Sequence, residues 1–179
     1  MLSYNELIGL IDDGVINAKR ENVNGASIDI TLGNTIRVES CIPHWPVVDL
    51  MEKEVVSTSE RDISIGSYVM QPGEAILAES VEVFNLPNDI TADYLVKSSM
   101  ARCFLNHALA GHCDPGWHGS VLTLELFNQS RYHRLKLTAG MKIGQVEFFR
   151  VDPVPNHASY ATVGQYNNSK TVTESGGLR

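Results

Sequence analysis

The chain of 179 residues has 43% hydrophobic and 20% charged residues and a net charge of −7. These values are typical of one soluble globular domain with a real core, and no apolar run approaches the ~20 residues that span a bilayer. The acidic balance disfavours nonspecific binding to nucleic acid, which requires clustered Lys and Arg. We therefore expect neither a membrane span nor a nucleic-acid partner.

The first residues, "MLSYNELIGLIDDG", predict both a location and a helix. They carry acids where a secretory signal has a basic region and an apolar stretch, so a cytoplasmic protein is the default expectation. Ser3 and Glu6 form a capping-box pattern, which marks a helix start. Apolar residues at helical spacing follow and predict one short N-terminal helix: Leu7, Ile8, Ile11 and Val15.

Beyond Gly25 the pattern changes to short strands separated by turns, with Gly or Pro at nearly regular intervals. This pattern favours a mainly β domain, built as a barrel or jelly roll, over an α/β sheet. The predicted strand segments are "ASIDITLG" (26–33), "NTIRVES" (34–40), "SYVMQPGEAILAESVEVFNLP" (67–87), "SVLTLELFNQS" (120–130) and "HRLKLTAGMKIGQVEFFRV" (133–151).

Three segments depart from the strand pattern. Residues 47–62 are charged, and we interpret them as a solvated loop. Residues 98–111, "SSMARCFLNHALAG", lack a period of two and predict a short helix buried against the barrel. Residues 156–179 are polar and rich in Gly, Ser, Thr and Asn, which predicts a tail that is disordered alone or orders over a ligand or a neighbouring subunit. We therefore expect a domain over 1–155 and a flexible tail over 156–179.

Cysteine and histidine usage argues against a metal centre. The three cysteines, Cys41, Cys103 and Cys113, form no CxxC pair and suggest reduced thiols. The crowding of His107, His112, Cys113 and His118 matches no zinc signature, and the His-x-Glu and Pro-Cys-x-x-Cys pattern of zinc nucleobase deaminases is absent. We expect no zinc.

Glu125 interrupts the apolar strand "LTLELFN". A carboxylate that loses water without gaining a partner has a raised pKa and is suited to proton transfer at neutral pH. Alternation along the strand places Glu125 with Val121 and Thr123, on the face opposite Leu122 and Leu124. From periodicity alone, that face is either solvated or the wall of a ligand pocket.

Two turns supply other candidate groups. "KSSMAR" (97–102) brings a lysine, two hydroxyls and an arginine to one turn, which fits either an ordinary helix cap or a phosphate site. "DPGW" (114–117) has the composition of a turn, where Asp114 and Trp117 either cap the turn and fill the core or face a ligand.

Together these segments resemble the dCTP deaminase branch of the dUTPase-like superfamily. The resemblance is carried, in this order and spacing, by "NGASIDITLG" (24–33), "KSSMAR" (97–102), "DPGWHG" (114–119), "LELFN" (124–128) and "AGMKIGQVEFF" (139–149). It implies a distorted jelly-roll β-barrel, assembled as a homotrimer with active sites between subunits. It also implies zinc-independent hydrolysis of the 4-amino group of a deoxycytidine nucleotide, with Mg²⁺ carried on the phosphates.

By position, the resemblance assigns Glu125 as the general base that takes a proton from water as it attacks C4. Ser98 and Arg102 would orient that water and support the glutamate, and the Ala110 carbonyl would contact the same water. Because no metal lowers the pKa of this water, a carboxylate and fixed hydrogen-bonding groups in a dry pocket would have to activate it.

The same resemblance assigns substrate contacts. The backbone at Cys113 and the side chain of Asp114 would meet the base and the 3′-hydroxyl, and Trp117 would wall the sugar. Further contacts would be made at the phosphates and at the closing side of the site, where the resemblance places Lys97, Ser99, Gln145 and Tyr166.

Three positions depart from the family pattern: Lys97 and His112 stand where arginine is common, and Gln165 where lysine often precedes the tail tyrosine. Lys170 or Arg179 could supply a compensating cation. Since a fixed cation is weakened at each, we hypothesise weaker dependence on a full triphosphate and activity on dCMP, dCDP or base-modified dCTP. A bifunctional enzyme that forms dUMP and pyrophosphate is a further alternative, and a nucleotide-binding regulator without activity is a third.

Overall fold

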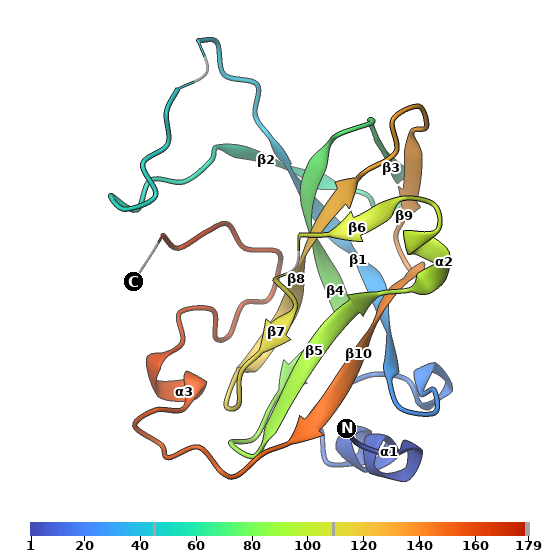
Figure 1. The fold of residues 1–179 in the computed structure, drawn as a ribbon, viewed down its shortest axis with the longest axis vertical. Coiled ribbons are helices and arrows are strands. Elements are labelled where there is room, and N and C mark those ends of the chain that lie inside the picture. The colour runs from blue at the N-terminus through green and yellow to red at the C-terminus, as the bar shows by residue number, and fades with distance from the viewer. Residues whose placement is uncertain (45, 109, 178–179) are drawn as a thin grey trace.

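The structure is a computed structural model that describes residues 1–44, 46–108 and 110–177. Most of the ordered elements are antiparallel strands, which confirms the predicted mainly β class (Figure 1). The strands are β1 (Ile28–Glu39), β2 (Thr58–Asp62), β3 (Ser67–Met70), β4 (Ala75–Asn85), β5 (Ile90–Val96), β6 (Leu105–His107), β7 (His112–Cys113), β8 (His118–Asn128), β9 (Leu135–Thr138) and β10 (Lys142–Arg150). The helices are α1 (Tyr4–Asp12), the 3-10 turn η1 (Arg20–Asn22), α2 (Ser98–Ala101) and α3 (Tyr160–Val163).

The order of strands in the main sheet shows that it is curled. Its path runs β6-β8-β4-β1-β10-β5-β7, with β2 paired to β1, and β3 and β9 form a separate two-stranded sheet. β6 and β7 lie at opposite ends of this path, yet His107 and His112 are separated by only a short segment of chain. The sheet must therefore bend until its two ends approach each other, which gives the half-closed barrel of Figure 1.

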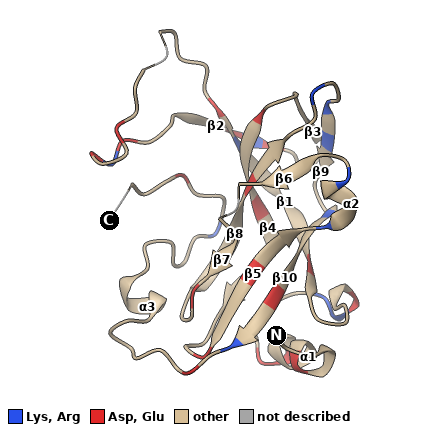
Figure 2. Ribbon diagram, viewed as in Figure 1, with Lys and Arg blue, Asp and Glu red and all other residues tan. Residues whose placement is uncertain are grey.

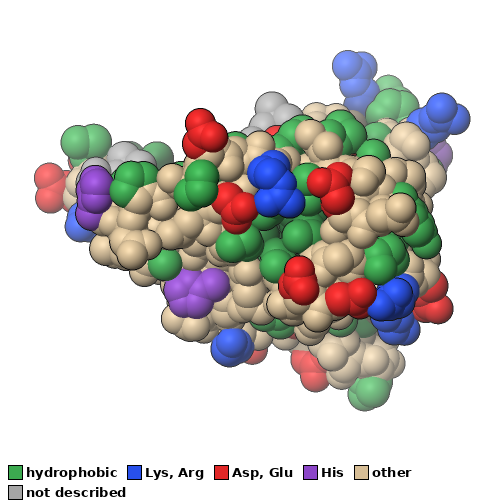
Figure 3. Space-filling model, turned by 90° about the horizontal axis from the view of Figure 1, so that it is seen from below, with side chains coloured by type: hydrophobic (Ala, Val, Ile, Leu, Met, Phe, Trp, Pro, Cys, Tyr) green, Lys and Arg blue, Asp and Glu red, His purple; other side chains and the backbone are tan. Residues whose placement is uncertain are grey.

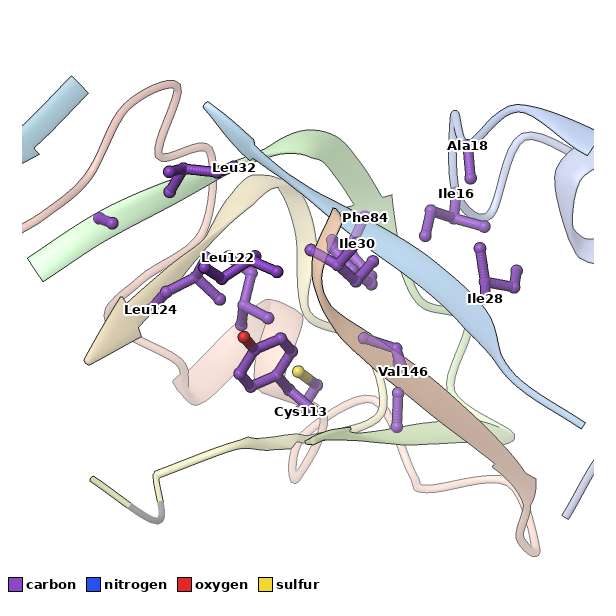
Figure 4. Close-up of a cluster of buried hydrophobic side chains, with 14 of the residues drawn as sticks. Ile16, Ala18, Ile28, Ile30, Leu32, Phe84, Cys113, Leu122, Leu124 and Val146 are labelled. Atoms are coloured by element: carbon purple, nitrogen blue, oxygen red, sulfur yellow. The ribbon is translucent and has the colours of Figure 1, made fainter. Parts of the chain in front are cut away.

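The core lies on the concave side of this sheet. Alternate residues of β8 point into it, and Leu122, Leu124 and Leu126 are all at most 7% exposed. In Figure 4 the labelled side chains of β1 and β8, including Ile30 and Leu124, reach toward the same interior as Cys113. The period-two alternation read from "VLTLEL" is confirmed in β8, and it leaves Val121, Thr123 and Glu125 on the other face.

The N-terminal helix α1 begins as predicted. The backbone N–H and the hydroxyl of Ser3 donate hydrogen bonds to the Glu6 carboxylate, at 2.9 and 2.7 Å. These bonds hold the pKa of Glu6 below its usual range. Leu7 and Leu10 are the buried residues of α1, so its apolar face is anchored to the main core.

The short helix predicted within residues 98–111 is present, but its predicted burial against the barrel is wrong. α2 covers only Ser98–Ala101 and has no buried residue. Phe104 takes a φ of 64°, which a helix cannot continue through, and Leu105–His107 then pair with β8 as β6. Strand pairing at the end of the sheet outweighs the local helical pattern, a common result for short segments.

The interpretation of residues 47–62 as a solvated loop needs correction as well. Thr58–Asp62 form β2, which pairs with residues Thr35–Glu39 of β1. Alternation is weak in this segment because both of its faces are largely exposed, so its sequence carries little strand signal.

The C-terminal segment lies along the outer side of β8. The Val121 N–H donates to the Ser169 carbonyl at 2.9 Å, and Val172 is 2% exposed. The Glu79 carboxylate accepts a hydrogen bond from the Val172 N–H at 3.1 Å. Residues 164–177 thereby form one wall of the hollow described below, opposite α2 in Figure 1.

None of the helices within the described residues is long and apolar enough to cross a membrane. Charges are unevenly placed on the ribbon: Lys and Arg gather at α2 and around β3 and β9, and carboxylates mark β5 and β10 (Figure 2). The face seen from below carries Asp and Glu side chains among hydrophobic ones (Figure 3).

Candidate functional site

A cavity of about 930 Å³ lies on the face of β8 that turns away from the core. Its walls come from β6, β7, β8, the turn after β7, the C-terminal segment and the connection between β1 and β2. That connection contributes Leu50, Glu54, Val55 and Val56, so part of the segment interpreted as a solvated loop lines the cavity. We call this cavity the Glu125 pocket. Its size and mostly apolar lining are typical of small-molecule sites.

Glu125 enters the pocket from the middle of β8. Burial raises the pKa of its carboxyl, and a hydrogen bond with its own backbone opposes this only in part. The physical cause is desolvation, because the surrounding surface does not replace the water that an ionised carboxylate loses. The sequence left open whether the face that carries Glu125 is solvated or is the wall of a ligand pocket. The structure shows that this face is a pocket wall.

Two residues from other strands share the environment of this carboxylate. His107, in β6, is buried, and desolvation lowers its pKa. Tyr94, in β5, meets the His107 ring edge-on with centroids 5.3 Å apart. Burial first, and then the charge of Glu125, raises the pKa of Tyr94 well above its usual range. The Glu125 pocket thus has a dry inner end in which ionisation is disfavoured.

The turn over residues 114–117 forms the next wall. Gly116 has a φ of 88°, and a Cβ there would stand 2.0 Å from the Ser159 hydroxyl, so only glycine fits. This turn directs Trp117 inward, where its ring packs 5.2 Å from Phe84 and its indole N–H donates to the Tyr166 carbonyl at 2.8 Å. Trp117 consequently links the core to the C-terminal segment.

A second group of polar residues lies outside the pocket, where β1 and β10 meet the turn 97–102. The Asp29 carboxylate, only 5% exposed, pairs with the Lys97 ammonium at 2.5 Å and with that of Lys142 at 3.0 Å. Although burial opposes it, hydrogen bonds from Lys97, Asn24 and Lys142 hold the pKa of Asp29 below its usual range. We call Asp29, Lys97 and Lys142 the lysine bridge.

The serines of the turn 97–102 are exposed, as is Arg102. Gln145 is directly opposite Asp29 in the pairing of β1 with β10, and its side-chain oxygen lies 3.5 Å from the Ser27 hydroxyl. The turn therefore presents hydroxyls and a guanidinium to the outside, next to a bridge that carries one positive charge in excess of Asp29.

The structure divides the predicted site residues into two sets. Those that line the Glu125 pocket are Ala110, Cys113, Asp114, Trp117, Glu125 and Tyr166. Those outside its lining are Lys97, Ser98, Ser99, Arg102, Gln145 and Lys170. Lys170 donates to the Gly119 carbonyl at 2.7 Å, and Arg179 lies outside the described residues.

Several residues of this region were not singled out from the sequence. Lys142 and Asp93 are charged residues in strands where polar and apolar residues alternate. Any solvated strand face has this pattern, so it does not indicate a functional site. Asp29 occurs within the motif "NGASIDITLG", which contributed to the family resemblance but assigned no function to this aspartate. Among the described residues, no group of three or more His, Cys, Asp or Glu side chains is arranged to hold a metal ion.

Comparison with known proteins places this chain in a family. A family model described as dCTP deaminase-like matches residues 1–151. A protein of Nocardioides sp. named "dCTP deaminase, dUMP-forming" is 40% identical over 136 residues, which cover 74% of this chain and 69% of that protein. A protein of Methanoculleus marisnigri with the same name is 33% identical over 148 residues, which cover 82% of this chain and 77% of that protein.

Solved structures agree on the fold. The 2′-deoxycytidine 5′-triphosphate deaminase from Agrobacterium tumefaciens superimposes with a TM-score of 0.64 at 22% identity, over 84% of this chain. This chain spans 48% of that protein. The native dUTPase of EIAV gives a TM-score of 0.50 at 15% identity, over 80% of this chain and 88% of that one. The dUTPase-like jelly roll expected from the sequence is confirmed.

Proposed function

The chain belongs to the dCTP deaminase-like family, and on that premise we propose that it hydrolyses the 4-amino group of a deoxycytidine nucleotide, with dCTP as substrate. The observation that carries the proposal is the Glu125 carboxyl, held on a pocket wall with its pKa raised by burial. A carboxylate of raised pKa takes and returns protons efficiently near neutral pH.

The proposed reaction begins with a water molecule held between Glu125 and the Ala110 carbonyl. Its oxygen attacks C4 of the cytosine ring while its proton passes to the Glu125 carboxylate. Glu125 passes this proton to N3 of the ring, then takes the proton of the new C4 hydroxyl and delivers it to the 4-amino group, so that the C4–N bond breaks and ammonia leaves as the C4 carbonyl forms. Desolvation of the pocket supports this role because it brings the proton affinity of the carboxylate closer to that of the groups with which it exchanges.

The neighbouring pocket residues would hold the substrate. The Trp117 ring, fixed between Phe84 and the Tyr166 carbonyl, offers a rigid wall for the deoxyribose. The carboxylate of Asp114, at the rim of the same turn, can accept a hydrogen bond from a sugar hydroxyl. We place the base at the dry end near Glu125 and the sugar at the turn.

We further propose that a second copy of the chain completes the site, in a homotrimer. The Glu125 pocket contains the base and sugar contacts, whereas Ser98, Ser99 and Arg102 lie outside its lining and face outward. A symmetric ring of three copies could bring the turn 97–102 of one chain to the pocket of the next. The phosphates, with their bound Mg²⁺, would then meet the hydroxyls, Arg102 and the lysine bridge.

The curated relatives support dUMP and pyrophosphate as the final products. The proteins of Methanoculleus marisnigri and Nocardioides sp. are both named dUMP-forming. In that case a second water attacks the α-phosphorus after deamination, and pyrophosphate leaves with its magnesium. The alternatives are release of dUTP, use of dCMP or dCDP, and nucleotide binding without turnover.

One experiment tests these possibilities together. Purified protein is incubated with Mg²⁺ and dCTP, dCMP, dCDP or dUTP, and ammonia and nucleotide products are quantified. We expect equal amounts of ammonia, dUMP and pyrophosphate from dCTP. Accumulation of dUTP would show a deaminase without the second step, and release of no ammonia from any deoxycytidine nucleotide would overturn the proposed activity.

A further inference from the structure

The connection between β1 and β2 carries an apolar surface that its own chain leaves uncovered. We call residues 46–57 of this connection the arm. In Figure 1 the arm projects from the barrel on the side away from β3, β9 and α2. Its apolar side chains that are at least 40% exposed are Val47, Leu50, Met51, Val55 and Val56. Apolar groups gathered in this way on a surface are typical of an interaction site.

Polar contacts within the arm hold its tip in one conformation. The Asp49 N–H donates to the Glu54 carboxylate at 2.8 Å, and the Glu54 N–H donates to the Asp49 carbonyl at 3.2 Å. The Met51 N–H donates to the Asp49 carboxylate at 2.9 Å. Leu50 and Met51 are therefore held exposed at the tip. A surface that is already ordered loses little conformational entropy when a partner covers it.

A second uncovered surface lies where the loop between β8 and β9 meets the residues after α2. Phe104 is 61% exposed and Tyr132 is 85% exposed. The Gln129 N–H donates to the Phe104 carbonyl at 2.9 Å and so joins the two segments. Phe104 has a φ of 64°, a strained conformation for a bulky residue, and such strain is common at functional positions. We call Phe104 and residues 129–136 the aromatic patch.

The two surfaces carry opposite charges. The arm has three carboxylates and one lysine, which are Asp49, Glu52, Glu54 and Lys53. The aromatic patch has three cations and no carboxylate, and these cations are Arg131, Arg134 and Lys136. None of the three forms an ion pair with another described residue. Unpaired cations beside exposed aromatic rings are complementary to an apolar surface with carboxylates around it.

A second copy of this chain is the partner that fits both surfaces. The arm and the aromatic patch lie on opposite sides of the barrel, so the arm does not reach the patch of its own chain (Figure 1). The patch of another copy offers rings to the apolar side chains of the arm and cations to its carboxylates. Contacts between two different surfaces of identical chains run head to tail, and they close into a ring when the rotation allows it.

From this complementarity we propose that the arm of one copy binds the aromatic patch of the next, with Met51 and Tyr132 near the centre of the contact. Leu50 and Val55 also line the Glu125 pocket, so the contact fixes a wall of that pocket. Phe104 closely follows the turn 97–102, so the same contact brings this turn toward the pocket of the copy whose arm is bound. Only this consequence for the nucleotide site rests on the proposed function.

The first test measures assembly by sedimentation velocity over a range of protein concentrations. Tyr132→Asp and Met51→Asp each place a charge within the proposed contact, and because both native side chains are exposed, both variants should fold. In each we expect the concentration at which the wild-type trimer dissociates to rise about tenfold or more. Circular dichroism checks that the fold is unchanged.

Tyr4→Asp is the matched control, since Tyr4 is an exposed tyrosine of α1 outside both surfaces. It should assemble as the wild type does. A monomeric wild type, a Tyr132→Asp variant that assembles like the wild type, or equal dissociation of the control would overturn the inference.

The second test identifies the contact without any nucleotide. Tyr132 is replaced by the photo-cross-linking amino acid benzoylphenylalanine, and the covalent dimers formed on irradiation are digested and analysed by mass spectrometry. We expect adducts on residues 46–57 of the second copy, and loss of these adducts when Met51→Asp is also present. Adducts confined to other segments, or the absence of a covalent dimer, would contradict the proposed interface.

The outcomes separate this inference from the proposed function. If the assembly and the adducts are as expected but no ammonia is released from dCTP, the proposed function fails and the interface stands. If ammonia is released while the adducts lie elsewhere, the interface fails and the proposed function stands.

Discussion

Two carboxylates of this molecule, the partly buried Glu125 and the buried Asp29, have opposite chemistry. Burial raises the pKa of Glu125, whose pocket is lined mostly by apolar groups. Asp29 is buried as well, but contacts with Lys97 and Lys142 hold its pKa below the usual range. The comparison shows that loss of water alone does not decide how a carboxylate behaves. Its partners decide whether it exchanges protons or remains a fixed charge.

The same contrast separates two halves of the proposed site. In our proposal the Glu125 pocket holds the base and moves protons, whereas the lysine bridge and the turn 97–102 hold the phosphates, so both halves are needed to act on a nucleoside triphosphate. The following predictions test this division, beginning with the largest expected effect.

Replacement of the Glu125 carboxyl should abolish most activity. Glu125→Gln keeps the shape of the side chain and removes the base, so we expect kcat on dCTP to fall by about 10²- to 10⁴-fold. Ammonia release measures this loss, and isothermal titration should show that dCTP still binds. A variant with wild-type turnover would exclude Glu125 as the base and place the proton transfer elsewhere.

Mixing two inactive variants should restore activity if the halves come from different chains. Glu125→Gln and Ser98→Ala homotrimers, exchanged by mild unfolding and refolding, would place an intact Glu125 beside an intact Ser98 in about a quarter of sites, since each has an even chance. Ammonia release then recovers to roughly that fraction of the wild-type rate.

The control for this mixture pairs Glu125→Gln with Asp114→Ala. Both residues line the pocket of one chain, so no mixed site contains an intact copy of each. We expect no recovery from that pair. Equal recovery in the two mixtures would contradict a site shared between chains, and a lack of recovery in both would show that Ser98 and Glu125 act within one chain.

Removal of the charge at Asp29 should destabilise the fold. Asp29→Asn leaves Lys97 and Lys142 without their counter-ion, and we expect a loss of about 2 kcal/mol in unfolding free energy at pH 7, less than for a fully buried pair because both lysines are partly exposed. Since the folded-state pKa of Asp29 is lowered, this stabilisation is present at neutral pH and disappears as pH falls through that value.

Urea unfolding at pH 7 and at pH 3 measures the difference. Asp89→Asn, which breaks the more exposed pair with Arg150, is the matched control and should change stability by about 0.5 kcal/mol or less. An equal loss of unfolding free energy in the two variants would show that the lysine bridge stabilises the fold no more than the exposed Asp89–Arg150 pair does.

The smallest predicted effect is the loss of unfolding free energy caused by the ionised Glu125 carboxylate. Because its folded-state pKa is raised, ionisation destabilises the native state, and the native state is relatively favoured when pH is low enough to protonate the carboxyl. Glu125→Gln should therefore be slightly more stable than the wild type at pH 7, and the gain should shrink as the solution is acidified. Thermal melting across this range checks the sign, and a gain independent of pH would contradict it.

Much of the barrel could be read from particular residues. Alternation in β8 separated Leu122 and Leu124 from Glu125, and the Ser3–Glu6 pattern marked the start of α1. The sequence failed at Leu105–His107, which are strand because β8 offers backbone partners, although their local pattern favours helix. It also failed to assign Asp93 and Lys142, since a charged residue on an exposed strand gives no sign of the partner it will meet.

The sequence by itself determined which groups were available: a carboxylate in an apolar strand, hydroxyls and cations on one turn, and a glycine-dependent turn before Trp117. Only the tertiary structure decided their chemistry. The C-terminal segment and the connection between β1 and β2 enclose the outer face of β8, so Glu125 is desolvated there, while pairing of β1 with β10 brings Lys142 to Asp29. Burial and charge contacts depend on distances between segments remote in the chain, and local residue patterns do not contain those distances.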